Sequence, residues 1–423
     1  MTRVVVTGLG VLSANAHGVE DFEKALREGR SGIRFQQKLK DLGFGCCVGG
    51  IPQGVDEIKG SYFTQEALLS VNSSMIYAGI ASIDCWKDAG LPLSVPRDTT
   101  IWWDTGAIIG CGVGGMDTTV EKLVPMVSAG KVRRMGSAMV EQIMSSAPSA
   151  MVGGLLGLGG QVTTNSSACT TGTEAVVNGF FQIREGRAKR MLVGGTEGSS
   201  AYVWSGFDSM RVLASKSNDQ PEKASRPMSA SAAGFVPSSG AGMLMLESLE
   251  SAKARGARIY AEVLGGHVNC GGQRGGGTMT APNPEGVVRC IREAITCAKI
   301  RPDDVEVING HLTATMADPL EVNNWCKALE RRPENFPLIN STKSMIGHGL
   351  GAAGGIECVG AVLQLSRGFV HGSINCEDIH PDLAPYAASI PHTTIDRQCT
   401  ILAKSSFGFG DVNGCIIFKR WSE

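Results

Sequence analysis

The chain lacks an excess of charge of either sign and any long apolar run. Its 423 residues include 39 Lys and Arg against 40 Asp and Glu, which gives a formal net charge of −1. This even balance provides no basic surface of the kind that binds nucleic acid, so we expect no such partner. No uninterrupted apolar stretch reaches the about 18 residues of a membrane span, so we expect none.

Paired cysteines are also lacking. The thirteen cysteines include no CxxC pair, and no cluster of Cys, His, Asp or Glu has metal-ligand spacing, so we expect no metal. The opening MTRVVVTGLG has no basic segment followed by an apolar core, as a secretory signal would. With an odd number of cysteines, this predicts a cytoplasmic protein whose thiols stay reduced.

A nucleotide-binding glycine motif is missing as well, although glycine itself is abundant. No GxGxxG follows a strand with an acidic residue at the right distance, and GCGVGG at 110–115 resembles that motif only weakly. The sequence therefore excludes an NAD-binding protein. The 56 glycines exceed the norm of about 7%, and clusters such as 275–277 suit tight turns or backbone close to a ligand. The length predicts two core-forming halves.

Short β-branched runs that end in glycine alternate with helical stretches. We expect strands at 4–10, 107–109, 190–193, 259–264, 305–308, 399–405 and 415–419, and helices at 168–184, 284–298, 318–331 and 349–366. Asp318 is expected to cap its helix. The alternation predicts an α/β fold with a parallel or mixed sheet that is buried on both faces.

The pattern restarts near Arg258. Each half has a glycine-rich helix start after a Ser/Thr cluster, NSSACTTGTE in the first and NSTKSMIGHGLG in the second. We interpret this as an ancient duplication, with residues 1–256 as the N-terminal half and 257–423 as the C-terminal half.

One cysteine has a reactive setting. Cys169 stands at the expected helix start among small residues, which let a substrate approach the backbone. The positive end of the helix dipole favours a thiolate there. The other cysteines are read as small buried hydrophobes.

Two of the seven histidines stand apart from the rest. His311 follows a strand and His348 opens a helix, each beside glycine. Neither has a second ligand three or four residues on, which argues against zinc. The remaining histidines are read as surface or core residues: His17, His267, His371, His380 and His392.

These motifs together resemble the β-ketoacyl-acyl carrier protein synthases of the type I/II kind, and the resemblance extends over nearly the whole chain. It rests on RVVVTGLG at the start, LREGRSGI at 26–33, SACT around Cys169, EKASRP at 222–227, STKSMIGHGLGAAG at 341–354 and SFGFGDVNG at 406–414. It implies the thiolase fold, in which two pseudo-repeated halves with mixed sheets form α-β-α-β-α layers.

The resemblance also implies a reaction. Cys169 would take an acyl chain from a phosphopantetheine thioester, and His311 and His348 would bind a malonyl thioester and assist its decarboxylation. The product would be a 3-ketoacyl thioester in fatty acid or polyketide/polyene-type synthesis, with no metal or organic cofactor. The implied partners are an acyl carrier protein and a second subunit, in a homodimer or in a heterodimer with a related ketosynthase-like chain.

Further roles follow from the resemblance residue by residue. Lys343 and Glu357 would stand beside the histidines, and the backbone amide of Phe409 would join that of Cys169 in an oxyanion hole. The residues implied to contact substrate are Thr313 and Thr315 along pantetheine, and Val113, Phe207 and Phe407 around the acyl chain. The residues implied to meet the acidic carrier protein are Arg133, Arg134 and Arg211. Val113, at the bottom of the acyl pocket, predicts a preference for intermediate chain lengths.

The chain departs from the family pattern in several places. The usual His-Gly-Thr-x-Thr-Pro-x-Gly-Asp is HLTATMAD at 311–318, one residue shorter and without its glycines and proline. Residues 65–74 carry no Lys or Arg where a carrier-docking helix usually has them, residues 228–235 lack the usual charges, and Asp411-Val412 replaces Gly-Thr. Together these predict a specialised synthase with its own carrier protein.

Two other readings share the fold. A non-catalytic partner subunit of the chain-length-factor type would lack the nucleophile, and Cys169 with both histidines argues against it. A thiolase would use a second cysteine in a different C-terminal glycine box, which Cys415 after Asn413-Gly414 does not fit well.

Overall fold

The computed structural model describes residues 2–93 and 99–422, whose main strands fall into two sets. The first half contributes β1 (Val4–Ser13), β5 (Thr105–Cys111), β6 (Val162–Thr163), β7 (Arg190–Glu197) and β8 (Gly240–Ser248). The second contributes β9 (Ala261–Cys270), β10 (Val307–Asn309), β11 (Leu338–Asn340), β14 (Ile401–Gly408) and β15 (Val412–Arg420).

Both sets have the same topology. The strand order is β11-β10-β14-β15-β9-β1-β8-β7-β5-β6, so each half is arranged as third, second, fourth, fifth and first strand of its set. Strand β5 is parallel to β6 and β7, while β8 is antiparallel to β7 and β1. Strands β10 and β15 repeat these pairings with β11, β14 and β9. The sets join where residues 4–6 pair with 261–263. This is the repeat that a duplication predicts.

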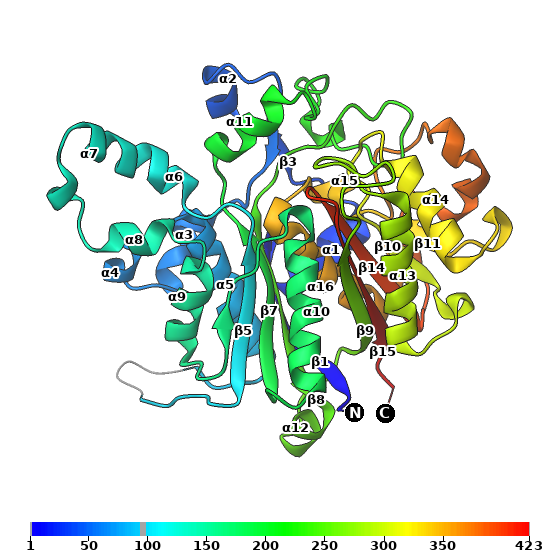
Figure 1. Cartoon of the computed structure of the whole chain (residues 1–423), viewed down its shortest axis with the longest axis horizontal. Coiled ribbons are helices and arrows are strands. Elements are labelled where there is room, and N and C mark those ends of the chain that lie inside the picture. Colours follow the sequence, from blue (N-terminus) through cyan, green and yellow to red (C-terminus); the bar gives the residue numbers. More distant parts are fainter. Residues whose placement is uncertain (1, 94–98, 423) are drawn as a thin grey trace.

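Helices form layers on both sides of each set of strands. Helices α10 (Thr171–Arg184) and α16 (Ala353–Arg367) lie in the middle and contact strands of both halves. Helices α5 (Ser73–Asp88) and α9 (Ala147–Leu156) cover the outer face of the first half. Helix α13 (Pro284–Ala298), with α14 (Asp318–Leu329) against it, covers the second. Figure 1 shows α10 between the two sets of strands, so the predicted α-β-α-β-α layering is confirmed.

Shorter elements connect these layers. The α-helices are α1 (Val19–Glu28), α2 (Gln37–Asp41), α3 (Val55–Ile58), α4 (Gln65–Leu68), α6 (Met116–Thr118), α7 (Val124–Ser128), α8 (Ala138–Ile143), α11 (Ala201–Ser209), α12 (Leu249–Ala254) and α15 (Lys343–Ile346). The strands are β2 (Ala16–His17), β3 (Ile33–Phe35), β4 (Val48–Gly50), β12 (Phe369–Val370) and β13 (Ile395–Asp396). Helical segments of other types are η1 (Lys59–Ser61), the π-helical η2 (Thr119–Leu123), η3 (Val132–Arg134), η4 (Ala168–Thr170), η5 (Pro221–Lys223), η6 (Pro302–Asp304), η7 (Pro333–Asn335), η8 (Leu350–Ala352) and the nine-residue η9 (Pro381–Ser389).

The expected elements agree with this structure apart from their ends. The helix expected at 284–298 has those bounds, whereas the strand expected at 305–308 starts two residues later, at Val307. Asp318 is not the helix cap: Ala317 takes that position, and Asp318 is the first helical residue. In the described part of the chain, no helix has the length and apolar character needed to cross a membrane.

The largest apolar core fills the space between the two sets of strands. Val176 and Phe180 of α10 pack there with Val359 and Val362 of α16. Each of these side chains is at most 2% exposed. Burial of this kind contributes about 1.5–3 kcal/mol per large side chain, so the two central helices hold the halves together.

The central helices meet through glycine backbone. A Cβ on Gly172 in α10 would lie 2.4 Å from the amide nitrogen of Gly355 in α16, and a Cβ on Gly355 would lie 2.3 Å from the carbonyl oxygen of Gly242 in β8. Neither separation leaves room for a methyl group. The N-terminal ends of α10 and α16 are therefore adjacent, although they come from different halves.

We expect Gly172→Ala to lower the free energy of unfolding by about 1–3 kcal/mol, because the added methyl must push α10 and α16 apart. Denaturant unfolding measures this loss. The matched control is Gly206→Ala in α11, where a Cβ meets nothing within 4 Å and where replacing a helical glycine should be neutral or mildly stabilising. Equal stability of the two variants would show that the helices tolerate a wider spacing.

Candidate active site

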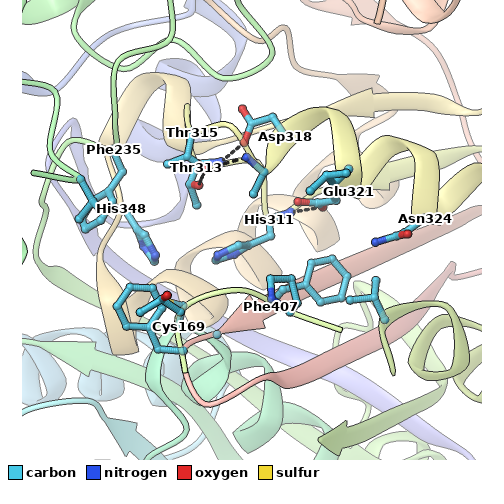
Figure 2. A pocket seen from close by; sticks show the side chains of 18 of the residues that line it. Cys169, Phe235, His311, Thr313, Thr315, Asp318, Glu321, Asn324, His348 and Phe407 are labelled. Atoms are coloured by element: carbon cyan, nitrogen blue, oxygen red, sulfur yellow. Dashed lines mark hydrogen bonds between the residues drawn. The ribbon is translucent and has the colours of Figure 1, made fainter. Parts of the chain in front are cut away.

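The ends of these helices open into a cavity of about 270 Å³. Cys169 lies at one end with His311 and His348 (Figure 2). The cavity walls also include Thr313, Thr315, Phe207, Phe407 and Phe409 among the residues predicted to bind substrate. Its outer part is largely apolar, with Met210, Val212, Phe235, Pro282, Val287 and Leu320.

Cys169 lies in the single turn η4, immediately before α10. The preceding Ala168 has φ +49°, a left-handed conformation that costs about 1–3 kcal/mol for a non-glycine residue and is common at functional sites. The backbone amide of Phe409 acts on the thiol so as to lower its pKa. Cys169 and Phe409 both line the cavity.

The expectation of a favoured thiolate is wrong. The surrounding protein raises the pKa of Cys169 to about 11, although the Lys343 ammonium and the Phe409 amide act in the opposite direction. Desolvation outweighs the helix end because η4 is only one turn long and the site is largely enclosed by protein. The resting group is a thiol.

The hydrogen bonds of His348 determine its tautomer. The backbone N–H of Leu350 donates to Nδ1 at 3.2 Å, so Nδ1 carries a lone pair and the hydrogen of the neutral ring sits on Nε2. Nε2 is buried and has no hydrogen-bond partner among the described residues. This leaves a donor available for an oxygen atom bound in the cavity.

His311 has the same tautomer, but a different group faces its Nδ1. The Lys343 Nζ lies 3.4 Å from its Nδ1 and donates to its backbone carbonyl at 2.7 Å. An ammonium can only donate, so the ring hydrogen is again on Nε2. The carboxylate of Glu321 holds the backbone by accepting the N–H of His311 at 2.6 Å and that of Leu312 at 2.8 Å.

Both histidines are neutral. Burial, followed by the charge of Lys343, lowers the pKa of each ring well below its ordinary value of 6.5. The ring centroids are 5.3 Å apart, and the sulfur of Cys169 and one nitrogen of each ring all lie within 4.8 Å of one another. One substrate atom can therefore contact all three side chains.

Three such ligands could in principle hold a metal ion, but the donor set does not suit one. A ligating imidazole must offer a lone pair on one nitrogen and donate from the other to an acceptor. Here both Nδ1 atoms face donors, Lys343 for His311 and the Leu350 amide for His348, so each Nε2 keeps its hydrogen. The pattern suits binding of a substrate oxygen better than binding of a metal.

A buried charge cluster lies behind the histidines. Lys343 is 1% exposed and Glu357 is fully buried, and Lys343 Nζ bonds Glu357 Oε1. The predicted pair therefore meets beside His311. A second ammonium, that of Lys404 in β14, lies 2.9 Å from Glu357 Oε2 and is also fully buried. The carboxylate of Glu357 thus forms ion pairs with both lysines.

The short loop after His311 is held by the acidic residues that follow it. Leu312 and Ala314 have φ values of +25° and +64°, which side chains rarely adopt. The Asp318 carboxylate accepts the N–H groups of Thr313 at 2.9 Å and Ala314 at 3.1 Å, which is its role in place of a helix cap. The hydroxyls of Thr313 and Thr315 bond each other at 3.0 Å on the cavity wall.

The replaced glycine at position 411 also has a structural role. Asp411 is fully buried with φ +61°. Its carboxylate accepts the N–H groups of Gln273 at 2.9 Å and Asn283 at 2.7 Å. It thereby fastens the glycine-rich segment 271–283, which supplies Pro282 to the cavity, against the loop that carries Phe409.

Other predicted residues lie apart from this cavity. Val113 does not line it, and its side chain is 37% exposed, because it sits on the turn after β5 rather than beneath Cys169. Arg133 and Arg134 form the exposed turn η3 and also do not line it. Arg211 is exposed beside Met210 of the cavity wall. Their predicted roles with acyl chain and carrier protein stay predictions.

Two buried charged residues were missed by the sequence reasoning. Lys404 is a lone charge inside the apolar strand ILAKSSFG, which is the signal that could have found it. Glu197 accepts the N–H groups of Gly112, Val113 and Gly351 at 3.0–3.1 Å, and burial raises its pKa to about 7. It connects the turn after β5 to η8.

We expect alkylation of Cys169 by iodoacetamide to accelerate about tenfold per pH unit from pH 6 to pH 10 without a plateau, because the thiolate is the nucleophile and its pKa is near 11. Mass spectrometry of the Cys169 peptide gives the rate, with exposed Cys270 as the internal reference. Lys343→Met should slow the reaction at each pH, since loss of the ammonium raises the thiol pKa further. A plateau below pH 8 would contradict this account.

Comparison with known proteins agrees with this geometry. Residues 1–252 match the N-terminal domain of β-ketoacyl synthase, and residues 260–377 match its C-terminal domain. The chain is 34% identical to 3-oxoacyl-[acyl-carrier-protein] synthase 1 of Escherichia coli, covering 100% of both proteins. It is also 34% identical to synthase 2 of Vibrio harveyi, covering 100% of this chain and 99% of that protein.

Solved structures give the same result. A β-ketoacyl synthase from Burkholderia phymatum superposes with a TM-score of 0.90 at 27% identity, and the ishigamide ketosynthase/chain length factor with 0.88 at 28%, each with 100% of both chains covered. A type II PKS acyl-carrier protein in complex with its ketosynthase bound to the hexaketide gives 0.86 at 26%, over 99% of this chain and 100% of that one. With both family domains matched and relatives aligned from end to end, this chain belongs to the β-ketoacyl synthase family.

Proposed function

We propose that the protein catalyses the decarboxylative Claisen condensation of an acyl group on Cys169 with a malonyl thioester on acyl carrier protein, which yields a 3-ketoacyl thioester. The observation that carries this proposal is the cluster of one thiol and two neutral Nε2–H donors around a single point in the cavity. The protein is an enzyme of the 3-oxoacyl-acyl carrier protein synthase type, like its relatives.

In the first step the sulfur of Cys169 attacks the carbonyl carbon of an acyl-pantetheine thioester. The oxyanion that forms accepts hydrogen bonds from the backbone N–H groups of Cys169 and Phe409, each worth about 3 kcal/mol in the transition state. The bond to the pantetheine sulfur then breaks. The leaving thiolate takes up the proton that Cys169 gave up, so no net charge remains in the buried site.

In the second step a malonyl thioester occupies the cavity. Thr313 and Thr315 are directed along the pantetheine arm, and the Nε2–H groups of His311 and His348 donate to the thioester carbonyl oxygen. Loss of carbon dioxide leaves the electron pair on the neighbouring carbon, as an enolate whose oxygen these donors stabilise. Neutral rings suit this role because each Nδ1 already accepts a hydrogen bond, so the ring hydrogen stays on Nε2, where it can be donated to the substrate.

The enolate carbon then attacks the acyl carbonyl on Cys169. A carbon–carbon bond forms, the carbon–sulfur bond to Cys169 breaks, and the thiolate regains a proton from solvent. The pKa of about 11 favours this return to the thiol. The same burial that slows attack by Cys169 therefore assists its release.

The competing readings are less consistent with the cavity. A non-catalytic subunit of the chain-length-factor type would not need the thiol of Cys169 beside two histidines whose Nε2–H groups face the cavity. A thiolase needs a second cysteine near the first, but Cys415 is buried in the outer core and does not line the cavity.

The partners, compartment and pathway belong to this proposal as well. We expect an acyl carrier protein to dock through Arg133, Arg134 and Arg211, and no metal or organic cofactor to take part. A second ketosynthase-like subunit, identical or related, would cover the arm of α6, α7 and α8 that projects from the body in Figure 1, where Val124, Val127 and Val132 are each at least 50% exposed. A cytoplasmic location and a specialised pathway fit the free thiols and the altered loops.

Replacing the histidines should separate the two steps. We expect His311→Ala or His348→Ala to retain acylation of Cys169 but to lower carbon dioxide release at least about 10²-fold, the usual effect of removing one such donor. Cys169→Ala should abolish acylation. Intact-protein mass spectrometry and labelled carbon dioxide measure the two steps. An adduct on Cys111 or Cys270, or unchanged condensation in both histidine variants, would refute the assignment.

We expect activity to survive removal of metals, because both imidazoles present N–H groups rather than lone pairs to the cavity. Condensation is measured after dialysis against a chelator and again after adding back single divalent ions. Activity that disappears and returns with one particular ion would count against the proposed mechanism.

A further inference from the structure

Lys404 is buried in the middle of β14, where its neighbours in the sheet are Asn309 of β10 and Ile416 of β15. The side chain is 0% exposed. An ammonium in such a position is costly to desolvate and persists only with partners that offset the cost.

Its partners tie Lys404 to the catalytic groups. Nζ lies 2.9 Å from Glu357 Oε2 and 3.1 Å from the hydroxyl of Ser406, and it also contacts the carbonyl oxygen of Ser405. The other oxygen of Glu357 bonds Lys343, whose ammonium reaches Nδ1 and the carbonyl of His311. The path from Lys404 to the ring of His311 thus contains only Glu357 and Lys343.

The two serines after Lys404 reach the remaining catalytic segments. The hydroxyl of Ser405 donates to Glu321 at 3.3 Å, and Glu321 holds the backbone of His311. Ser406 bonds Thr173 of α10 at 2.8 Å, one turn beyond Cys169. Residues 404–406 therefore contact the supports of both the nucleophile and the histidine.

We propose that Lys404 is a positioning residue for the decarboxylation step: by holding Glu357 Oε2 it directs Oε1 to Lys343, and its charge keeps the histidine rings oriented with Nε2–H toward the malonyl carbonyl. This inference rests on the proposed condensation. It adds a second buried cation to the site, beside Lys343 and Glu357.

The electrostatics support the same role. The charged and titratable groups facing the rings are Lys343, Lys404, Glu357, Glu321 and Cys169. Burial first, and then the charges of Lys343 and Lys404, lower the pKa of His348, and the same causes act on His311. Protonation would put an Nδ1–H against Lys343 in one ring and against the Leu350 amide in the other, so a charged ring would have to turn away.

Two substitutions separate anchoring from charge. Lys404→Met removes both the hydrogen-bond donor and the charge. Lys404→Gln keeps an N–H donor for Ser406 beside Glu357 but removes the charge. Lys419→Met, the same change on the adjacent strand β15 and outside the active site, is the matched control.

The readouts are acylation of Cys169, decarboxylation of malonyl carrier protein between pH 5 and pH 9, and the NMR titration of His311 and His348, which is feasible because the chain has only seven histidines. For Lys404→Met we expect a rate of acylation within about twofold of that of the unmodified enzyme and decarboxylation at least about tenfold slower at pH 8. The acid limb, the pH below which decarboxylation declines, should rise by about one unit, because loss of the positive charge makes the histidine rings easier to protonate. For Lys404→Gln we expect decarboxylation near normal at pH 8 with the same displaced acid limb. Lys419→Met should change none of these.

Three results would overturn the inference. The first is an unchanged rate of decarboxylation in Lys404→Met, and the second is an equal loss of acylation and decarboxylation with a lower melting temperature. The third is that the pKa values of the His311 and His348 rings are unchanged in both Lys404 variants. If Lys404→Met does not fold, the Gln variant still decides, since an unmoved acid limb contradicts the charge effect. Absence of condensation in the unmodified protein would instead count against the proposed function. The ring titrations would remain a test of Lys404, because they do not depend on turnover.

Discussion

The backbone contact between α10 and α16 is the constraint on which the site depends. Gly172 and Gly355 let the two central helices approach without intervening side chains, and Gly355 continues the contact to Gly242 of β8. Because the nucleophile precedes α10 and His348 precedes α16, this approach brings groups from different halves within reach of one substrate atom. A duplicated half alone would hold only part of the chemistry.

Burial governs the charge states around this contact. It raises the pKa of Cys169 to about 11 and lowers those of both histidines, so the resting site holds a thiol and two neutral rings. The charges beside them are those of the lysine–glutamate cluster, whose members face one another, and that of Glu321 on the backbone of His311. Transferable protons stay on the groups that contact substrate, while the fixed charges stay behind them and orient the rings.

The departures from the family pattern are concentrated in the loops around the cavity. Leu312 occupies positive φ where the usual pattern offers glycine, Ala314 also has positive φ, and Asp318 and Glu321 hold that loop through its backbone N–H groups. Asp411 does the same for segment 271–283. The thiol and the two histidines are retained, whereas loops in the cavity wall depart from the family pattern.

The local sequence determined the elements and the residues of the chemistry. Helix 284–298, the duplication, Cys169 and the two histidines all follow from patterns within a few residues, because propensity and motif chemistry act over that range. Tertiary structure alone decided the protonation of Cys169, since enclosure by distant segments outweighs the helix end. It also decided the places of Val113 and Lys404. Exposure and ion pairing depend on which strands and helices come together, and residues 404 and 357 meet because β14 packs against α16.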